Sequence, residues 1–459
     1  MMWMKRCMLL AALLPGVVQA GDGDLVAAFG DGGIAQLGIA DGYGSEASNP
    51  VVGPDGSITY CATRGTPPDT DMVVVRVEAD GSPDTSFSSD GRFTLDFGGN
   101  EDTCTAVVVQ PDGRIVVAGS TQDDTQLNFA LARFNPSGTL DTTFGTGGRQ
   151  QVQFDVFGGA FSEARALAIQ PNGRLVVAGY MGVTGVTRQM AVARLLADGS
   201  YDTSFNGIGR QRVQGIGDEA ADYSRAHAVA LDGSGRILLA GQAAKYTNDI
   251  LEEDFAAARL LPDGALDSTF GGTGHTTVAF DFGGAAGSNR DIANALRSMP
   301  DGRIVLAGEV DVSATATSNL DMAFVRLLAD GTPDATFGND GRTLVAFDRT
   351  PSGYDTARTL VLDGGHIVAG GYAYTDGGSG VDLAFVRLLP NAARDPSFGN
   401  LGRRTLDLGL TDPGVQVVGG LVRDRSRLLF SGLMLVAPNT VDVFVGALES
   451  DTLFAYGME

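Results

Sequence analysis

The chain has 459 residues, of which 55 are acidic and 32 basic, giving a formal net charge of −23 at pH 7. This excess of negative charge, with no stripe of clustered cations, argues against nucleic acid as a partner, because proteins that bind polyanions neutralise phosphates with grouped Lys and Arg. Glycine accounts for 65 residues, about twice its usual share, which indicates a globular chain with many tight turns.

Residues 1–20 have the features of an export signal. Lys5 and Arg6 precede the apolar run of residues 7–14, and the segment ends at the small residue Ala20. A cationic start, a short apolar core and a small-residue site suit signal peptidase, and the run is too short to span a bilayer. We therefore predict cleavage near Ala20, a periplasmic or secreted protein, and no membrane span. Removal of Lys5 and Arg6 leaves 30 basic residues against 55 acidic ones, a net charge of −25.

A ten-residue phrase recurs along the rest of the chain, with its clearest copy, QPDGRIVVAG, at residues 110–119. The Gly or Ser before its Arg, or before the residue in that place, stands at Gly56, Gly113, Gly173, Gly235, Gly302, Gly365 and Ser426. A second marker, a Phe usually followed by Gly, stands at Phe29, Phe87, Phe144, Phe205, Phe270, Phe337 and Phe398. Two independent markers that keep one period of about 60 residues indicate seven copies of one structural unit.

Each copy has the pattern of four short strands. In the fifth copy we expect strands at residues 277–282, 291–299, 303–310 and 321–328, which are rich in aliphatic and β-branched residues and bounded by turn residues. An Asp-Gly turn such as Asp301-Gly302 suits a tight hairpin, so the second and third strands should pair. No segment between the strands has the ten or more periodic residues of a helix, which predicts an all-β chain.

Such units are best closed into a β-propeller, because radial repetition leaves only short sheet edges exposed. A β-helix is the rival fold, but its coils usually hold far fewer residues. We therefore expect residues 21–459 to form one seven-bladed propeller of four antiparallel strands per blade, present as a monomer. The blades are expected at about residues 30–86, 88–143, 145–204, 206–269, 271–336, 338–397 and 399–455.

The composite pattern PDGR[IL]VVAG, followed by ARL..DG.LD..FG..G, is clearest at residues 110–148, 170–209 and 299–341. It resembles the Delta-60 repeat family of bacterial exported proteins over nearly all of the mature chain. The first and last copies depart most from the pattern. The resemblance implies an exported, propeller-like protein of largely unassigned activity, and it supplies no functional site.

A pair of opposite charges recurs with a spacing of eight residues. The arginines are Arg76, Arg133, Arg194, Arg259, Arg326 and Arg387, and the aspartates that follow them are Asp84, Asp141, Asp202, Asp267, Asp334 and Asp395. In the expected strand Arg133 shares a face with Leu131 and Phe129, so it should be partly buried. Because a buried guanidinium needs a carboxylate, we interpret the pairs as one structural salt bridge per unit rather than as six ligand sites.

Two cysteines, Cys61 and Cys104, remain after the signal. An oxidising compartment would permit a disulfide. However, Cys61 takes the place of Ala118 in the repeat, and Cys104 lies before the next copy. We interpret them as two small buried residues and leave their pairing open.

The sequence carries no recognisable catalytic signature. His275 and His366 stand where other copies have Arg, and His227 occupies a variable polar position, so the three histidines do not form a ligand set. No HExxH, CxxC, GxSxG or phosphate-loop motif is present. We therefore assign no catalytic residue and expect no cofactor, with a bound Ca²⁺ ion as the alternative that stays open.

Carboxylates recur before the second strand of several copies, at Glu46, Asp102, Glu163, Asp291 and Asp355. If the blades are equivalent, these side chains form a ring on one rim, where close carboxylates would attract Ca²⁺ or a cationic group because hard cations prefer oxygen ligands. The alternative is a set of solvated loops. On a rim tens of ångströms around, no more than one or two copies could share an ion.

Three functions remain open. The first is an exported, non-enzymatic binding or scaffold propeller for an unknown protein, glycan or cationic ligand, and the lack of catalytic motifs favours it. The second is a metal-dependent hydrolase or lactonase with a site in the propeller channel, which rests on analogy with the fold alone. The third is a surface or adhesive protein, which the absence of an anchor disfavours.

Overall fold

The computed structural model describes residues 21–39, 47–98, 101–123, 126–159, 161–184, 187–216, 223–247, 250–280, 290–313, 319–347, 353–374, 380–409, 415–437 and 440–450. The expected signal and its cleavage site lie outside these ranges. Within them the regular structure is β-strand apart from one short 3₁₀ helix, η1 (Asp155–Phe157), so the prediction of an all-β chain is confirmed. None of the described helices is long and apolar enough to cross a membrane.

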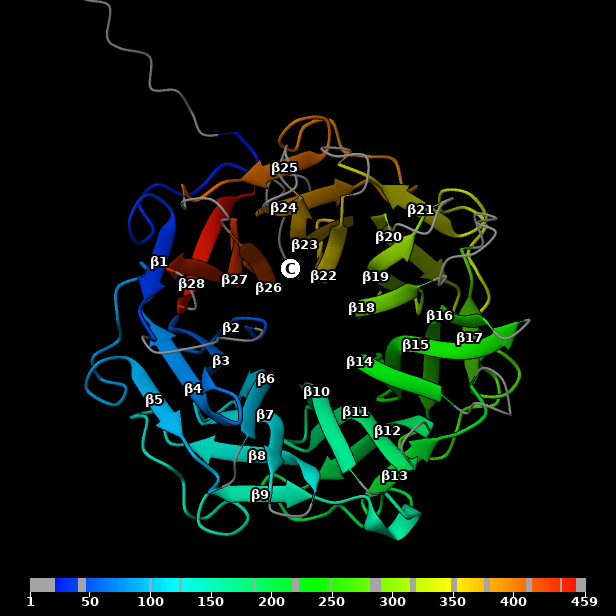
Figure 1. Cartoon of the computed structure of the whole chain (residues 1–459), viewed down its shortest axis with the longest axis horizontal. Coiled ribbons are helices and arrows are strands. Elements are labelled where there is room, and N and C mark those ends of the chain that lie inside the picture. The colour runs from blue at the N-terminus through cyan, green and yellow to red at the C-terminus, as the bar shows by residue number, and fades with distance from the viewer. Residues whose placement is uncertain are drawn as a thin grey trace, which may run out of the picture.

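The strands form four-stranded antiparallel units around a common centre, a propeller-like arrangement (Figure 1). Three sheets consist of one such unit. Two eight-stranded sheets each consist of two units joined by one parallel residue pair, Thr70 with Glu101 in the first and Arg188 with Tyr223 in the second.

Each unit contributes one strand to each of four rows, counted from the centre outward (Figure 1). The innermost strands are β2 (Val51–Val52), β6 (Glu101–Val109), β10 (Phe161–Ile169), β14 (Tyr223–Leu231), β18 (Asp291–Ser298), β22 (Asp355–Asp363) and β26 (Gln416–Asp424). The second strands are β3 (Ile58–Thr66), β7 (Ile115–Gln122), β11 (Leu175–Thr184), β15 (Ile237–Thr247), β19 (Ile304–Asp311), β23 (His366–Tyr374) and β27 (Arg427–Ala437). The third strands are β4 (Asp69–Val77), β8 (Leu127–Phe134), β12 (Thr187–Leu195), β16 (Ile250–Leu260), β20 (Leu320–Leu327), β24 (Val381–Leu388) and β28 (Thr440–Glu449). The outermost strands are β5 (Arg92–Leu95), β9 (Arg149–Val152), β13 (Arg210–Val213), β17 (His275–Val278), β21 (Arg342–Val345), β25 (Arg403–Leu406) and β1 (Ile34–Leu37).

The units group the strands differently from the sequence-based expectation. The strand expected to open the fifth copy, residues 277–282, overlaps β17, which pairs with β16 and so completes the preceding unit. The reason lies in the loop before β17, where the Arg259 N–H donates to Gly274 O (2.9 Å) and the Gly274 N–H donates to Phe270 O (2.7 Å). This loop returns the chain directly alongside β16. The expected pairing of the next two strands is confirmed, because β18 pairs with β19.

The hydrophobic core lies between neighbouring units. One cluster joins Phe129 of β8 to Val177 of β11, and another joins Ile58 of β3 to Leu429 of β27. The second cluster brings together strands from opposite ends of the chain. Strand β1 likewise pairs with β28, with Ile34 opposite Gly446.

The charge pairs predicted from the eight-residue spacing are confirmed. In each pair the arginine Nε lies 2.6 to 2.9 Å from a carboxylate oxygen, and both side chains are buried: Arg76–Asp84, Arg133–Asp141, Arg194–Asp202, Arg259–Asp267, Arg326–Asp334 and Arg387–Asp395. We call each pair, with the Ser or Thr and the Phe that it contacts, an arginine clamp.

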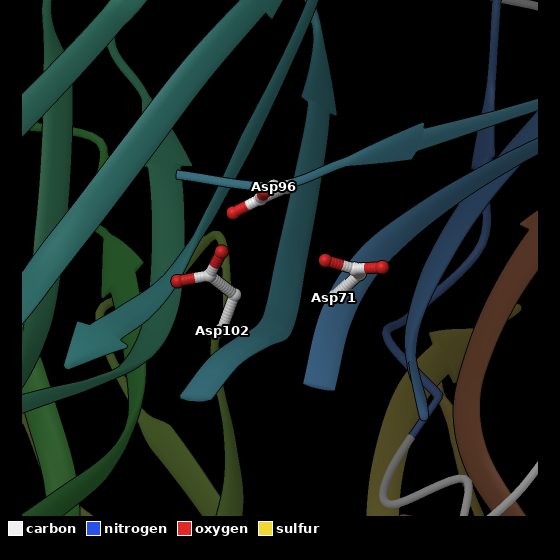
Figure 2. Close-up of side chains that lie close together, drawn as sticks. All are labelled: Asp71, Asp96 and Asp102. Atoms are coloured by element: carbon white, nitrogen blue, oxygen red, sulfur yellow. The ribbon is translucent and has the colours of Figure 1, made fainter. Parts of the chain in front are cut away.

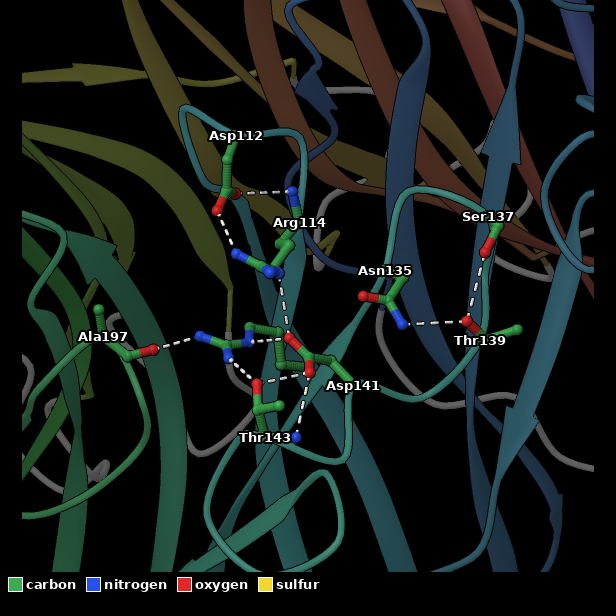
Figure 3. A network of polar contacts seen from close by, with 9 residues as sticks. Asp112, Arg114, Asn135, Ser137, Thr139, Asp141, Thr143 and Ala197 are labelled. Atoms are coloured by element: carbon green, nitrogen blue, oxygen red, sulfur yellow. Dashed lines mark hydrogen bonds and ion pairs between the residues drawn. The ribbon is translucent and has the colours of Figure 1, made fainter.

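One clamp illustrates how an arginine uses its donors. Arg194 donates from Nε to Asp202 (2.7 Å) and from one terminal nitrogen to Ser204 Oγ (3.0 Å). Its other terminal nitrogen donates to the carbonyl of Pro262 in the next unit, and the guanidinium lies over the Phe205 ring at 4.9 Å from the centroid. Figure 3 shows the equivalent group around Asp141. A clamp therefore fixes both its own unit and the contact with a neighbour.

The clamp aspartates also form ion pairs with the arginine of the recurring phrase. Arg114 lies 3.0 Å from Asp141, and Arg174 lies 2.8 Å from Asp202. In the sixth copy His366 takes this place, at 3.5 Å from Asp395. The Arg of the PDGR phrase is thus a second, more exposed cation for the same carboxylate.

The interpretation of the two cysteines as separate buried residues is wrong. Cys61 of β3 and Cys104 of β6 are fully buried, but they form a disulfide, with their Cα atoms 5.9 Å apart. They come together because β3 packs against the innermost strand of the next unit. The repeat spacing alone does not reveal this contact between units.

We predict that Arg194→Ala lowers the melting temperature and costs about 3–5 kcal/mol, because it leaves a buried carboxylate without its main partner. Arg326→Ala should behave in the same way, since each clamp acts on its own unit and one neighbour. Asp202→Asn is the cleaner probe of charge, because it keeps the arginine stem packed. Thermal unfolding followed by circular dichroism measures these effects, with Arg64→Ala as a control outside the clamps. An unchanged melting temperature with loss of ligand binding would assign the clamps to function instead.

Candidate functional site

The innermost strands carry β-bulges at equivalent positions. In β6 the register against β7 shifts between Cys104 and Ala106, which leaves Thr105 as the extra residue. The same shift occurs in the strands that follow, and it leaves Arg165, His227, Asn294, Arg358 and Gly419 as the extra residues. A bulge bends the strand and redirects a side chain out of the ladder.

The last glycine of the recurring phrase permits these bulges. A Cβ on Gly119 would lie 1.7 Å from the carbonyl oxygen of Thr103, and a Cβ on Gly179 would lie 1.9 Å from that of Glu163. Any side chain there would drive the innermost strand away. The repeated glycine is therefore needed for the close approach that lets the bulge form.

The bulge residues line one cavity among the innermost strands. It has a volume of about 330 Å³, and Thr105, Arg165, His227, Asn294 and Arg358 are in its wall, together with Asn49 of the segment before β2. An adjoining cavity of about 350 Å³ shares these six residues and adds Arg297. We call the two together the central cavity. The bulges thus bring one position that varies between units to a common space.

Two bulge residues connect one innermost strand to the next. Thr105 donates to the carbonyl of Ala164 (3.1 Å), and Asn294 donates to the carbonyl of Ala357 (3.0 Å). These hydrogen bonds between strands explain why both positions are polar, and no ligand is needed to explain it.

The charged bulge residues have different neighbours. The guanidinium of Arg165 pairs with Glu163, and that of Arg358 lies 5.7 Å from the centroid of the Tyr372 ring. His227 shares a 2.9 Å hydrogen bond between Nε2 and Gln242 Oε1. All three are only partly buried, so they keep surface that faces the cavity.

Four of the carboxylates singled out in the sequence lie near the beginning of innermost strands. Asp102, Asp291 and Asp355 are buried and accept the backbone N–H of Phe97 (2.6 Å), Phe280 (2.9 Å) and Phe347 (2.6 Å), each in the segment that follows an outermost strand. They hold the chain where it passes from one unit to the next.

Glu163 is not equivalent to the other carboxylates. It lies two positions before its bulge residue, whereas Asp102 lies three positions before Thr105. Its carboxylate accepts the hydroxyl hydrogen of Tyr180 and pairs with Arg165. Glu46 lies outside the described residues.

One cluster of three carboxylates is present among the described residues. Asp71, Asp96 and Asp102 each offer one oxygen, and these oxygens lie within 4.8 Å of one another (Figure 2). Burial raises the pKa of Asp102, hydrogen bonds from Thr121 and the Phe97 N–H oppose this, and the charges of Asp96 and Asp71 raise it further. Burial and the charge of Asp96 also raise the pKa of Asp71. Since Ca²⁺ takes about six to eight oxygens, the cluster supplies only part of a calcium shell.

The other two histidines lie outside the innermost strands, at the beginning of β17 and of β23. His275 opens the outermost strand β17, and burial lowers the pKa of its imidazole. His366 contacts the clamp carboxylate Asp395. Neither lines the central cavity, which has His227 in its wall.

Sequence reasoning missed the bulge residues as a set. The signal was present, because Thr105, Arg165, His227, Asn294 and Arg358 occupy one repeat position, flanked by constant small or apolar residues. A variable polar residue at a constant place in an otherwise repeated strand indicates a specific role. The bulge that gives all of them the same direction was not visible in the alternation of the strand.

The repeats match a known family model. Residues 53–87, 110–144, 170–205, 233–270, 300–337 and 365–398 match the family described as "Domain of unknown function (DUF5122) beta-propeller". The chain is therefore a β-propeller repeat protein. No curated protein matches it.

Solved structures with a similar fold are distant. One is a protein of unknown function from Dyadobacter fermentans DSM 18053, with 13% identity, 91% of this chain and 98% of that chain covered, and a TM-score of 0.46. The polysaccharide lyase Uly1 has 11% identity, coverage of 88% and 90%, and a TM-score of 0.49. The GH93 α-L-arabinofuranosidase of Fusarium graminearum in complex with arabinobiose has 10% identity, coverage of 91% and 97%, and a TM-score of 0.44. Matches this distant carry no argument about the function of this chain.

We predict that Asp96→Asn raises the melting temperature of the metal-free protein at neutral pH, because it removes a charge that disfavours ionised Asp71 and Asp102. Groups with a raised pKa in the folded state destabilise that state once they are ionised, so the gain should grow as the pH rises through their titration. Thermal unfolding in EDTA at a series of pH values measures it. A lower melting temperature for Asp96→Asn, with stabilisation of the unmutated protein by Ca²⁺, would contradict this and point to an ion site.

Proposed function

We propose that this β-propeller repeat protein is an exported, non-enzymatic binding protein that holds its ligand in the central cavity. The main support for the proposal is that the bulge residues, which differ from unit to unit, all line the central cavity. Positions copied in every unit serve the fold, whereas Thr105, Arg165, His227, Asn294 and Arg358 differ in chemistry yet share one direction. A concave site with a few convergent polar groups is the usual form of a ligand site.

A closed ring of seven blades, present as a monomer, is part of this proposal. The pairing of β1 with β28 supports closure, because it completes a four-stranded unit from both ends of the chain. The clamp of the sixth repeat adds support, since a terminal nitrogen of Arg387 contacts Asp22 near the amino terminus rather than a carbonyl of a later unit. Closure of this kind fixes the innermost strands around the cavity.

Export is supported by three features. Residues 1–20 have the pattern of a cleavable signal, and the resemblance to the Delta-60 repeat family suits an exported protein. The disulfide between Cys61 and Cys104 suits an oxidising compartment such as the periplasm or the medium.

Binding is favoured over metal-dependent hydrolysis by the chemistry of the wall. Among the described residues that line the central cavity, His227 is the sole imidazole and no carboxylate is present. Catalytic zinc sites use three protein ligands from His, Cys, Asp or Glu, and acid–base pairs need a second titratable group. The guanidinium and amide groups of the wall are suited to holding a ligand.

We predict that a ligand found by a thermal-shift screen of saccharides, sugar acids and organic acids loses its effect in His227→Trp. The larger ring would fill the space between the innermost strands without removing a clamp. Val156→Ser, an exposed change in η1, is the matched control and should bind as the unmutated protein does. Binding that persists in His227→Trp would place the site elsewhere, and conversion of the ligand to a product, detected by mass spectrometry, would make the protein an enzyme.

A further inference from the structure

We propose that the ligand of the central cavity is an oxyanion, a carboxylate, sulfate or phosphate group, bound by the guanidinium groups of Arg165, Arg297 and Arg358. This inference rests on the proposed function and deepens it by naming the class of ligand.

The wall of the cavity has a charge opposite to that of the chain. The protein has 55 acidic and 32 basic residues, yet the described residues that line the central cavity include three arginines, one histidine and no Asp or Glu. A lining of one sign within a low-dielectric wall concentrates counter-charged ligands. The cavity therefore favours a negatively charged ligand, although the protein as a whole carries a negative net charge.

Arg297 gives the strongest indication. It lies three residues after the bulge in β18, where the other units have the small apolar residues Val108, Ala168, Ala230, Val361 and Val422. Among the described residues no carboxylate forms a salt bridge with it, and its guanidinium donates a 2.8 Å hydrogen bond to the Leu296 carbonyl. Burial lowers the pKa of the Arg297 guanidinium, which means that the charged form lacks full compensation in this position.

Arg297 differs from the clamp arginines because no carboxylate among the described residues forms a salt bridge with it. Arg194 and Arg326 are buried with a carboxylate at 2.7 Å, as expected for a guanidinium away from water. The side chain of Arg297 is only partly buried, unlike those of the clamp arginines. Arg297 instead faces the cavity, where an anionic ligand would supply the missing charge.

Arg165 and Arg358 add two further guanidinium groups to the wall of the cavity. Arg165 shares its charge with Glu163, which fixes the side chain, and Arg358 lies near the ring of Tyr372, which supports the guanidinium plane. A planar guanidinium offers paired N–H donors that match the two oxygens of a carboxylate, sulfate or phosphate group. His227, at the bulge between those of Arg165 and Asn294, adds a ring nitrogen to the same wall.

Isothermal titration calorimetry at low ionic strength tests the inference with four probes: citrate, inorganic phosphate, a sulfated disaccharide and the same disaccharide without sulfate. We expect at least one anion to bind and the neutral disaccharide not to bind. Arg297→Gln and Arg358→Gln should each weaken that binding about tenfold or more, because each removes charge-assisted hydrogen bonds. Arg297→Lys should retain part of the affinity, and Arg64→Gln, which removes an arginine outside the cavity, should retain all of it. The pattern among the three anions distinguishes a carboxylate from a sulfate or phosphate ligand.

Two results would overturn the inference. The first is that no anion binds, or that an anion binds equally well to Arg297→Gln and Arg358→Gln. The second is that the neutral disaccharide binds and His227→Trp abolishes this binding, in which case the cavity is a ligand site for an uncharged group and the proposed function stands. If an anion binds and all variants in the cavity, including His227→Trp, leave its affinity unchanged, both the inference and the location of the proposed function are wrong.

Discussion

The structure depends on the burial of an arginine in nearly every unit. A guanidinium away from water is tolerated only when its charge and its donors are satisfied, and Arg194 meets this requirement with Asp202, Ser204 and a carbonyl of the next unit. Burial alone would raise the pKa of Asp334, but hydrogen bonds from Thr336 and the Arg326 guanidinium more than offset this and lower it to about 2. Since the clamp reaches into the neighbouring unit, it fixes how adjacent sheets pack as well as how each one folds.

A second repeated constraint connects this scaffold to the site. The glycine at the end of the recurring phrase allows the innermost strand to approach so closely that no Cβ would fit, and the bulge opposite it redirects one residue toward the centre. The clamp and the glycine each recur in six units, where they serve the fold. The redirected residue does not recur, and this difference separates the residues that build the ring from those that give the cavity its chemistry.

Much of the fold could be predicted from the sequence because its signals are local and repeated. The all-β class, the hairpin between the second and third expected strands, and the pairing of Arg133 with Asp141 all follow from spacing and alternation. The grouping of strands into units did not, because β17 pairs backward through a loop, and the repeat pattern does not tell which of its neighbouring strands it joins. The disulfide and the cavity were missed for a related reason. Cys61 bonds to Cys104, and Arg165 and Arg358 line one cavity, only through the packing of different units.

The pH dependence of stability tests the role of the clamps most directly. Urea unfolding of the unmutated protein and of Asp334→Asn should be compared between pH 7 and pH 2. Asp334 has a pKa of about 2 in the folded state against an ordinary value of 3.8, so its contribution is present above the ordinary value and is lost as the pH falls toward 2. We expect the unmutated protein to lose stability over this range, and Asp334→Asn to be less stable at pH 7 but to lose less between pH 4 and pH 2. Equal losses in the two proteins would contradict the account.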